Sequence, residues 1–462
     1  MLNENHGLPA GTSELLSRYD RPGPRYTSYP TAPVWTEAFT AADCEQRLAA
    51  AGGRRDEPLS LYVHIPYCAS MCWYCACSVV ISQDVEKGER YVDDVLREAA
   101  LARRHMGHGR AVVQHHWGGG TPTFLQPAAI ERLFGGLCEL FPLAPSAEVS
   151  IEVDPRVTTR AHLEALAAAG MNRISMGVQD FDPAVQKAIH REQSLEQTRA
   201  IVDGARELAF ESVNVDLVYG LPGQTVESFA RTLATITDLR PDRIACYSYA
   251  HVPWLKKHQK LIDEKALPLG AAKLALYHEA LRHLCAAGYE PVGMDHFARS
   301  DDELAVAARG GRLHRNFMGY TTMPASDMVA FGVTAIGDVD GAFTQNLKGV
   351  AEWRAAIDQG RLPVHRGHRR SIDDEARRRI ILDIMCRFGV TFADHGGAAS
   401  FRREYADELT RLQPMIDDGL CTLDAQGLRV TSIGRLFVRN LCMVFDAHLP
   451  AAAQPGRFSR TV

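Results

Sequence analysis

Tyr62-Val-His-Ile-Pro-Tyr-Cys-Ala-Ser-Met-Cys-Trp-Tyr-Cys-Ala-Cys77 is the stretch that decides how this chain is organised, because it carries four cysteines within ten residues. The first three, Cys68, Cys72 and Cys75, have the spacing C-x3-C-x2-C, so that one loop can direct three thiolates to one metal centre. A cubane iron–sulfur cluster has four iron corners and normally binds four cysteines. Three ligands leave one iron open to a group that is not protein, which predicts chemistry at the cluster as well as electron transfer.

Other uses of clustered cysteines fit the chain less well. A disulfide framework is disfavoured because eleven cysteines in 462 residues are sparse and the N-terminus has neither the basic start nor the apolar run of a secretory signal. A structural zinc site usually divides its ligands between two separated pairs, and the sequence has no second C-x2-C pair. Cys77 could complete an electron-transfer cluster, although a C-x-C step directs two thiolates awkwardly toward one cube. The remaining cysteines lie among apolar residues and are expected to fill the core: Cys44, Cys138, Cys246, Cys285, Cys386, Cys421 and Cys442.

The overall composition does not favour a nucleic-acid or membrane-surface partner, because the net charge is −5 and the charged fraction is an ordinary 23 %. The sequence has no run of 18 apolar residues, so no transmembrane helix is expected. An oxygen-sensitive cluster needs a reducing compartment, which favours the cytoplasm. At this length we expect a monomer with one large catalytic domain and an accessory one.

Between about residues 59 and 250, short apolar runs alternate with amphipathic stretches. The strand-like runs are Leu59–Ile65, Ala111–Trp117, Ala147–Val153, Arg173–Val178, Ser212–Val218 and Arg243–Tyr249. Helical spacing of apolar residues marks the segments Lys87–Arg104, Arg160–Ala169, Leu195–Leu208 and Val226–Leu239. Six βα units in succession predict an α/β fold whose parallel sheet closes fully or partly into a TIM-like (β/α) barrel.

The active site of such a barrel forms at the carboxyl ends of its strands. The cysteine loop follows the first predicted strand, and Gly118-Gly-Gly-Thr-Pro-Thr follows the second. The later strands deliver, in order, Glu152 and Asp154, Gln179-Asp180, Asp216, and Tyr249-Ala250-His251. Because every unit supplies a polar or glycine-rich group to the same rim, we expect these residues to form one site.

From about residue 366 the pattern changes to a smaller, mostly helical domain. Ser371–Phe388 and Ala398–Asp418 have helical spacing, and Cys421–Ile433 is typical of a hairpin around Gln426-Gly427. Helix, helix and hairpin is a winged-helix-like order, which raises DNA binding as a function. A packing or lid domain is favoured instead, because no basic stripe is concentrated there.

The beginning of the chain contains Arg18-Tyr-Asp-Arg-Pro-Gly-Pro-Arg-Tyr-Thr-Ser-Tyr-Pro30, which is rich in tyrosine, arginine and proline. Such a segment is expected to cover the substrate, although it could equally be a solvated tail. The predicted division is therefore an N-terminal covering segment (1–58), a catalytic barrel domain (59–365) and a C-terminal helical, winged-helix-like domain (366–462).

The cysteine loop, preceded by Tyr-Val-His-Ile-Pro, resembles the cluster motif of the radical S-adenosylmethionine (SAM) enzymes. Further segments resemble one subfamily, the oxygen-independent coproporphyrinogen III oxidases of heme biosynthesis. They are Arg25-Tyr-Thr-Ser-Tyr-Pro, Gly118-Gly-Gly-Thr-Pro-Thr, Ile151-Glu-Val-Asp-Pro-Arg, Ser175-Met-Gly-Val-Gln-Asp-Phe, Asp216-Leu-Val-Tyr-Gly-Leu-Pro-Gly-Gln-Thr, Gly293-Met-Asp-His-Phe-Ala, His314-Arg-Asn-Phe-Met-Gly-Tyr-Thr-Thr and Arg457-Phe-Ser-Arg. The resemblance extends from about residue 18 to the C-terminus.

The resemblance implies a [4Fe–4S] cluster held by Cys68, Cys72 and Cys75, with one SAM on the fourth iron and a second SAM beside it. The residues implied to hold the cluster-bound SAM are Tyr62, Gly119, Glu152, Ala250 and Ile336. Those implied to hold the second SAM are Tyr74, Gly120, Thr121, Gln179, Arg191 and Asp216. Those implied to act in catalysis are Tyr62, His64 and Cys77.

The implied reaction is the oxidative decarboxylation of two propionates of coproporphyrinogen III to vinyl groups, which gives protoporphyrinogen IX and CO2. A 5′-deoxyadenosyl radical, made from SAM at the cluster, would remove a hydrogen from the propionate β-carbon. Arg25, Arg299 and Arg315 are candidates to bind the carboxylates of this tetrapyrrole substrate. The electron donor and acceptor cannot be identified from the sequence.

Two alternatives belong to the same superfamily: a heme-binding chaperone and a radical SAM methyltransferase. Cys77, the Arg25-Tyr-Thr-Ser-Tyr-Pro segment and the Arg457-Phe-Ser-Arg tail favour the oxidase, because we expect the chaperone branch to lack them.

Overall fold

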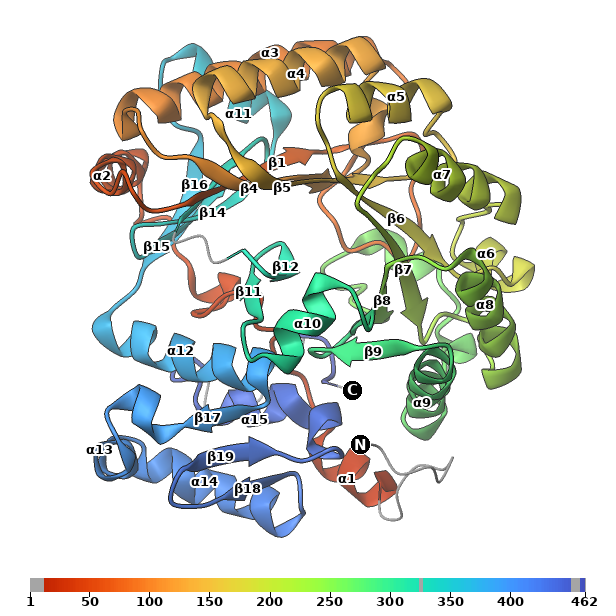
Figure 1. The fold of residues 1–462 in the computed structure, drawn as a ribbon, viewed down its shortest axis with the longest axis vertical. Helices are drawn as coiled ribbons and strands as arrows, with labels where there is room; N and C mark the ends of the chain where they lie inside the picture. The colour runs from red at the N-terminus through yellow and green to blue at the C-terminus, as the bar shows by residue number, and fades with distance from the viewer. Residues whose placement is uncertain (1–11, 324–326, 450–457, 462) are drawn as a thin grey trace.

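The computed structural model describes residues 12–323, 327–449 and 458–461, and its centre is a twelve-stranded sheet (Figure 1). The strand order is β16-β15-β14-β13-β1-β4-β5-β6-β7-β8-β10-β9. The parallel strands that follow one another along the chain are β1 (Leu59–Ile65), β4 (Val112–Gly119), β5 (Leu143–Val153), β6 (Arg173–Gln179), β7 (Ser212–Tyr219) and β8 (Arg243–Ser248). The sheet curves into an arch, and within the described residues its end strands β16 and β9 do not pair with each other, so the barrel is partial.

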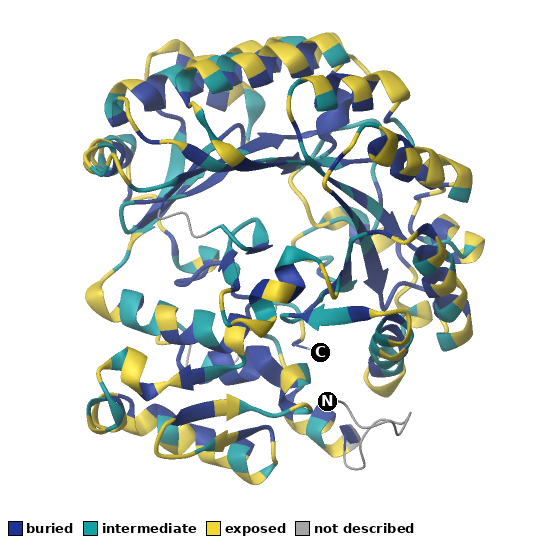
Figure 2. Cartoon of the chain, viewed as in Figure 1, coloured by how far each residue is buried: buried dark blue, intermediate teal, exposed yellow. Residues whose placement is uncertain are grey.

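Helices cover the outer face of this arch. They are α3 (Glu86–Met106), α4 (Pro127–Leu140), α5 (Arg160–Ala168), α7 (Leu195–Glu207), α8 (Val226–Leu239) and α9 (Ala271–Ala286). Thr159, Ser194 and Thr225 begin α5, α7 and α8 with capping boxes that satisfy free N–H groups of the first turn. Fully buried side chains such as Trp117 and Phe229 fill the layer between sheet and helices, and Figure 2 shows these strands buried and the outer helix faces exposed.

All six predicted strands and all four predicted helices are present, with the predicted ends for Leu59–Ile65 and Val226–Leu239 and shifted ends for the others, and the α/β partial barrel is confirmed. The edges of the sheet were not predicted. They consist of β13 (Asp327–Phe331), β14 (Ile336–Val339), β15 (Ala342–Asn346) and β16 (Val364–Arg369) beside β1, and of β10 (His296–Arg299) and β9 (Tyr289–Val292) beside β8. These strands are four to six residues long, too short for their apolar alternation to be distinguished from a loop.

The C-terminal region lies below the arch in Figure 1 and has its own hydrophobic cluster, which includes Ile384, Phe392, Phe401 and Leu441. It contains α12 (Ile372–Arg387), α13 (Ala398–Glu404), α14 (Ala406–Asp417), α15 (Val438–Val444) and a three-stranded antiparallel sheet of β17 (Gly389–Thr391), β19 (Gly427–Val430) and β18 (Cys421–Leu423). The predicted helices and hairpin are therefore present, with the second helix divided at Tyr405. The winged-helix description is not confirmed, and the domain boundaries stay predictions.

The N-terminal segment packs into the C-terminal region. Tyr26 and Tyr29 are 2 % exposed and belong to its hydrophobic cluster, and the Tyr26 hydroxyl donates to Asp446 Oδ2 at 3.0 Å. The Arg439 guanidinium donates to the carbonyls of Gly23 and, at 2.8 Å, of Pro24. A solvated tail is therefore excluded for these residues, while residues 1–11 and Arg457 lie outside the part of the chain that the structure describes.

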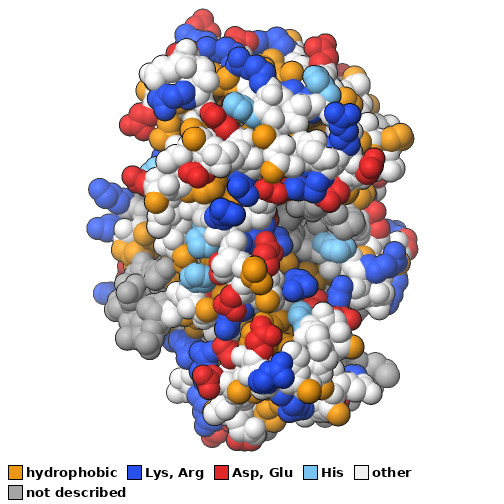
Figure 3. Space-filling view, turned by 90° about the vertical axis from the view of Figure 1, so that its left-hand side faces the viewer, with side chains coloured by type: hydrophobic (Ala, Val, Ile, Leu, Met, Phe, Trp, Pro, Cys, Tyr) orange, Lys and Arg blue, Asp and Glu red, His pale blue; other side chains and the backbone are white. Residues whose placement is uncertain are grey.

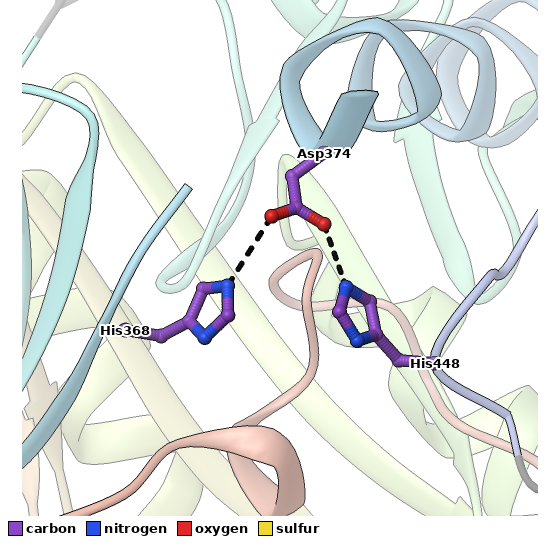
Figure 4. A group of neighbouring side chains, drawn as sticks. All are labelled: His368, Asp374 and His448. Carbon is purple, nitrogen blue, oxygen red and sulfur yellow. Dashed lines mark hydrogen bonds and ion pairs between the residues drawn. The ribbon is translucent and has the colours of Figure 1, made fainter. Parts of the chain in front are cut away.

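A His–Asp–His cluster joins the C-terminal region to the sheet (Figure 4). Asp374, in the first turn of α12, is hydrogen-bonded to His368 Nε2 of β16 at 3.3 Å and to His448 Nε2 at 2.6 Å. The same carboxylate caps α12 by accepting from the Ser371 N–H at 2.9 Å. Burial opposes ionisation of Asp374, but the hydrogen bonds from His448 and Ser371 outweigh it and lower its pKa to about 2.

Two surface properties complete the description. Among the described helices, none combines the length and the apolar character that crossing a bilayer requires. On the face shown in Figure 3, lysine and arginine side chains intermingle with aspartate and glutamate.

Candidate active site

A cavity of about 280 Å³ opens at the carboxyl ends of β4, β5, β6 and β7. Most of the predicted site residues line it: Cys68, Cys72, Tyr74, Cys75, Cys77, Gly119, Gly120, Thr121, Glu152, Gln179, Arg191 and Asp216. The predicted residues that do not line it are Tyr62, His64, Ala250 and Ile336. Segments more than a hundred residues apart in sequence thus meet at one place, as expected for the rim of a parallel barrel.

The cysteine loop connects the short strands β2 (Tyr67–Cys68) and β3 (Val80–Ile81), and its cysteines are free thiols. Cys72 Sγ lies 3.5 Å from Arg156 Nη2 and 3.6 Å from Arg191 Nη1. Cys68 Sγ lies 3.5 Å from Thr121 Oγ1. Because guanidinium groups stabilise the thiolate form, these contacts suit sulfur atoms that bind a metal centre.

Cys77 acts on its neighbour Cys75. The Cys77 N–H donates to Cys75 Sγ at 3.4 Å. A hydrogen bond from the Cys77 side chain lowers the pKa of Cys75 to about 7; burial opposes this shift, and the Cys77 N–H and Lys256 support it. Burial raises the pKa of Cys68 to about 11, but a bound metal removes such a proton outright. Three thiol groups of one loop that face one cavity beside two guanidinium groups fit an iron–sulfur cluster.

The glycine loop after β4 has no room for side chains. A Cβ on Gly118 would lie 2.9 Å from the Glu152 carboxyl, and one on Gly120 would lie 2.6 Å from the Pro66 carbonyl oxygen. Gly119 has a φ of +116° and would bring a Cβ within 2.6 Å of the His64 ring. The main chain therefore forms the cavity wall here, and its N–H and C=O groups can approach a ligand closely.

Two acids on this rim have opposite electrostatic properties. Burial disfavours ionisation of Glu152, but His116, whose Nε2 lies 3.6 Å away, and the Gly119 N–H at 3.2 Å lower its pKa. The Glu152 side chain is 46 % exposed, because it faces the open cavity. Burial and the charge of Glu152 raise the pKa of Asp216 to about 7, although Asn214 donates to it at 2.7 Å.

Arg191 is fixed at the far wall of the cavity. Its Nη2 donates to the Gly177 carbonyl at 2.6 Å and its Nη1 donates to Asp154 Oδ2 at 3.2 Å. The side chain is 6 % exposed, and its Nε has no hydrogen-bond partner among the described residues. A buried guanidinium N–H without a partner is costly, so this donor fits a bound carboxylate or carbonyl.

Comparison with known proteins agrees with this geometry. Residues 62–236 match the Radical SAM superfamily, and residues 371–437 match the HemN C-terminal domain. The oxygen-independent coproporphyrinogen III oxidases of Pseudomonas aeruginosa and Escherichia coli are each 43 % identical to this chain, over 97 % of it and 98 % of their own length. The chain belongs to the oxygen-independent coproporphyrinogen III oxidase family. A solved structure of coproporphyrinogen III oxidase (HemN) from Escherichia coli, described as a radical SAM enzyme, superposes with a TM-score of 0.88 at 42 % identity, covering 92 % of this chain and 98 % of its own.

Membership of the oxygen-independent coproporphyrinogen III oxidase family identifies a [4Fe–4S] cluster and SAM as the cofactors. Tyr62 and His64 lie behind the part of the cavity wall that Gly119 forms. The Tyr62 hydroxyl is 3.1 Å from His64 Nδ1, and His64 Nε2 is 3.0 Å from the Ser78 carbonyl oxygen in the cysteine loop. His64 thus supports both the cysteine loop and Gly119.

Ala250 and Ile336 lie elsewhere. The Ala250 carbonyl accepts from Gln259 Nε2 at 3.2 Å, at the start of the segment after β8. Ile336, in β14, is 5 % exposed and packs with Trp35 and Phe343 in a separate apolar cluster. Their predicted contacts with SAM stay predictions.

Several residues of the site were not predicted. Arg156 contacts Cys72 and pairs with Asp154 at 2.6 Å, and its only sequence signal was its place in the Ile151-Glu-Val-Asp-Pro-Arg motif. His116 points from β4 toward Glu152, where strand alternation alone could have placed it on the inner face.

The three arginines expected to bind substrate carboxylates occupy different places. Arg25 donates to the Ser248 carbonyl at 2.6 Å, at the carboxyl end of β8. Arg315 is 9 % exposed, lies 4.4 Å from the centre of the Tyr320 ring, and lines a cavity of about 420 Å³. Arg299 pairs with Asp301 beside the amino end of β8, on the opposite end of the barrel from the cysteine loop.

Proposed function

We propose that the protein catalyses the oxidative decarboxylation of two propionates of coproporphyrinogen III to vinyl groups, giving protoporphyrinogen IX and CO2. The observation that supports this most is the convergence of three cysteines, a glycine loop, two acids and a buried arginine on one cavity, in a member of the oxygen-independent oxidase family. The [4Fe–4S] cluster and SAM that these residues would hold would supply a radical able to remove a hydrogen atom from the propionate β-carbon.

In this proposal Cys68, Cys72 and Cys75 hold the cluster. Arg156 and Arg191 balance the negative charge of the thiolates, since both reach Cys72 Sγ. This pairing matters because a buried anionic cluster without nearby cations would be strongly destabilised. Cys77 remains outside the ligand set and adjusts the Cys75 sulfur through its hydrogen bonds.

Each of the two proposed SAM positions contains one acid of the rim, Glu152 in the first and Asp216 in the second. Glu152, ionised by His116 and the Gly119 N–H, accepts hydrogen bonds from the cluster-bound SAM. Arg191 and Asp216 hold the second SAM, with Asp154 fixing the guanidinium so that its free Nε–H is already oriented. Tyr62 and His64 position the glycine loop rather than touching the reacting atoms.

Arg315 is the strongest candidate for a substrate carboxylate. Its Nε and Nη1 are buried without a hydrogen-bond partner among the described residues. The cavity of about 420 Å³ beside it also includes Tyr26 and Tyr29, so the N-terminal segment would cover a substrate there. We place this enzyme in the reducing cytoplasm as a monomer, with no nucleic-acid or membrane partner.

The test is an anaerobic assay of the protein with a reconstituted cluster, SAM, dithionite, coproporphyrinogen III and an electron acceptor. Protoporphyrinogen formed together with 5′-deoxyadenosine and CO2 would support the proposal. Tight heme binding without decarboxylation, or a methylated product, would refute it.

A further inference from the structure

The segment 251–269, between β8 and α9, lies directly against the cysteine loop. Three of its side chains are hydrogen-bonded to main-chain carbonyl oxygens of that loop: Lys256 to Cys77 at 2.8 Å, His258 to Cys75 at 2.7 Å and Gln259 to Tyr74 at 2.8 Å. Gln259 is fully buried and also donates to the Ala250 carbonyl, so it anchors the segment at its base. The segment is therefore attached to the cysteine loop beside Cys75, one of the three predicted cluster ligands.

The outer face of the segment is unusually apolar. Trp254, Leu255, Leu261 and Leu269 are 50 %, 61 %, 59 % and 68 % exposed. Eight large hydrophobic side chains are exposed among the described residues, and half of them lie in this one short segment. Single exposed apolar residues need no explanation, whereas a group of them marks a surface that binds a partner.

The charge of the segment is opposite to that of the whole chain. It contains four lysines, of which Lys257, Lys260 and Lys265 are exposed, and two acids, Asp263 and Glu264. The chain as a whole carries a net charge of −5, so this apolar surface is bordered by local positive charge in a negative protein. Such a surface attracts and orients a partner whose own contact face is acidic.

We propose that segment 251–269 is the docking surface for the protein that reduces the cluster, a small acidic carrier of single electrons. This inference rests on the proposed function, because each SAM cleaved consumes one electron that a donor must supply to the cluster. The carrier is oxidised by one electron and the cluster is reduced by one. A carrier seated on Trp254 and Leu261 would reach the cysteine loop through the hydrogen bonds of His258 and Lys256.

Lysines that do not contact the cysteine loop allow a direct test. Lys257→Glu/Lys260→Glu reverses the charge of two exposed side chains, and Arg199→Glu/Lys348→Glu makes the same change in charge at exposed positions of α7 and of the loop before α11 (Val350–Asp358). Reduction of the reconstituted cluster by an acidic [2Fe–2S] ferredoxin is followed anaerobically by stopped-flow absorbance. Dithionite, which needs no docking surface, serves as the second reductant.

We expect Lys257→Glu/Lys260→Glu to lower the second-order rate of reduction by ferredoxin about 10-fold at low salt. Trp254→Ala should also lower this second-order rate, because a higher ferredoxin concentration is then needed for the half-maximal rate. Added salt should slow reduction of the wild type more than reduction of the charge-reversal variant. Reduction by dithionite and the control variant should keep wild-type rates. An unchanged ferredoxin rate in the double variant, or an equal loss with dithionite, would overturn the proposal.

Two further outcomes are distinguishable. A wild-type dimer in analytical ultracentrifugation that Lys257→Glu/Lys260→Glu dissociates would assign this surface to a second copy of the chain and overturn the carrier. Failure of dithionite-reduced enzyme to decarboxylate coproporphyrinogen would refute the proposed function, and reduction by ferredoxin would still be measurable in that case.

Discussion

Gly119→Ala should damage the cofactor site because two separate costs meet at this position. Holding a non-glycine residue at a positive φ such as +116° costs about 1–3 kcal/mol. The added Cβ would also lie 2.6–2.9 Å from three atoms of the His64 ring, an overlap that typically costs a further ~1–3 kcal/mol. The His64 ring cannot move away freely, because the Tyr62 hydroxyl and the Ser78 carbonyl hold both of its nitrogens.

Gly170→Ala is the matched control. Gly170 also has a positive φ, of +91°, but no atom lies within 4 Å of an added Cβ, so only the backbone cost applies. Urea unfolding of the apo protein can be followed by tryptophan fluorescence, and SAM binding to the reconstituted protein by calorimetry. Gly119→Ala should unfold at lower urea than Gly170→Ala by the equivalent of ~1–3 kcal/mol, and it alone should weaken SAM binding.

The collision can be tested separately from the backbone strain. The double variant His64→Ala/Gly119→Ala should lose less stability than the sum of the losses in the two single variants. The shortened side chain at position 64 removes the overlap with the added Cβ. Equal stability of Gly119→Ala and Gly170→Ala, or unchanged SAM affinity in Gly119→Ala, would refute the reasoning.

Three other outcomes follow from the site and from the His–Asp–His cluster of His368, Asp374 and His448. Cys72→Ser should abolish the visible absorption of the cluster and SAM cleavage, whereas Cys77→Ser should keep its iron and lose turnover; iron analysis that shows the reverse would contradict the ligand set. The pKa of Asp216 is raised to about 7 in the folded protein, whereas an aspartate in the unfolded chain loses its proton near pH 4. Between these two pH values the folded state binds more protons than the unfolded state, so the free energy of unfolding decreases as pH rises from about 4 to 7. In Asp216→Asn, the urea midpoint of the apo protein should no longer decrease with this contribution between pH 5 and 8. The same pH dependence in wild type and variant would contradict the raised pKa of Asp216. The lowered pKa of Asp374 contributes about 2 kcal/mol at pH 7, which is lost as pH falls from about 4 toward 2. Asp374→Asn should speed hydrogen exchange in α12 at pH 7, while the exposed neighbour change Asp373→Asn should not.

The central part of the fold was predictable because its signals are local. Each parallel strand is a buried run such as Leu59–Ile65, and the residue that ends it reaches the rim whatever the curvature of the sheet. Cys68, Glu152 and Asp216 could therefore be assigned to one site before any contact between them was known. That assignment needed only the direction of the strands.

The remaining parts depend on contacts that no local pattern encodes. The segment 251–269 contains two short 3₁₀ turns and no periodic run, so its position over the cysteine loop comes from the side chains of Lys256, His258 and Gln259. β13 joins β1 although more than 250 residues separate them, and its five residues offer little pattern. Ile336 is a further case, because the family resemblance implied a SAM contact for it, while its packing against Trp35 could not be predicted from the sequence.

The two acids of the rim show why residue type is insufficient to assign a role. Glu152 and Asp216 both end in carboxyl groups, both come from neighbouring parts of the sheet, and both face the same cavity. Glu152 is ionised because His116 and the Gly119 N–H lie beside it, and its negative charge then raises the pKa of Asp216. At neutral pH we therefore expect Glu152 to act only as an acceptor, while a protonated Asp216 can also donate. Removal of the Glu152 charge should lower the pKa of Asp216, so a Glu152→Gln substitution would alter the electrostatics of both proposed SAM positions and not of one alone.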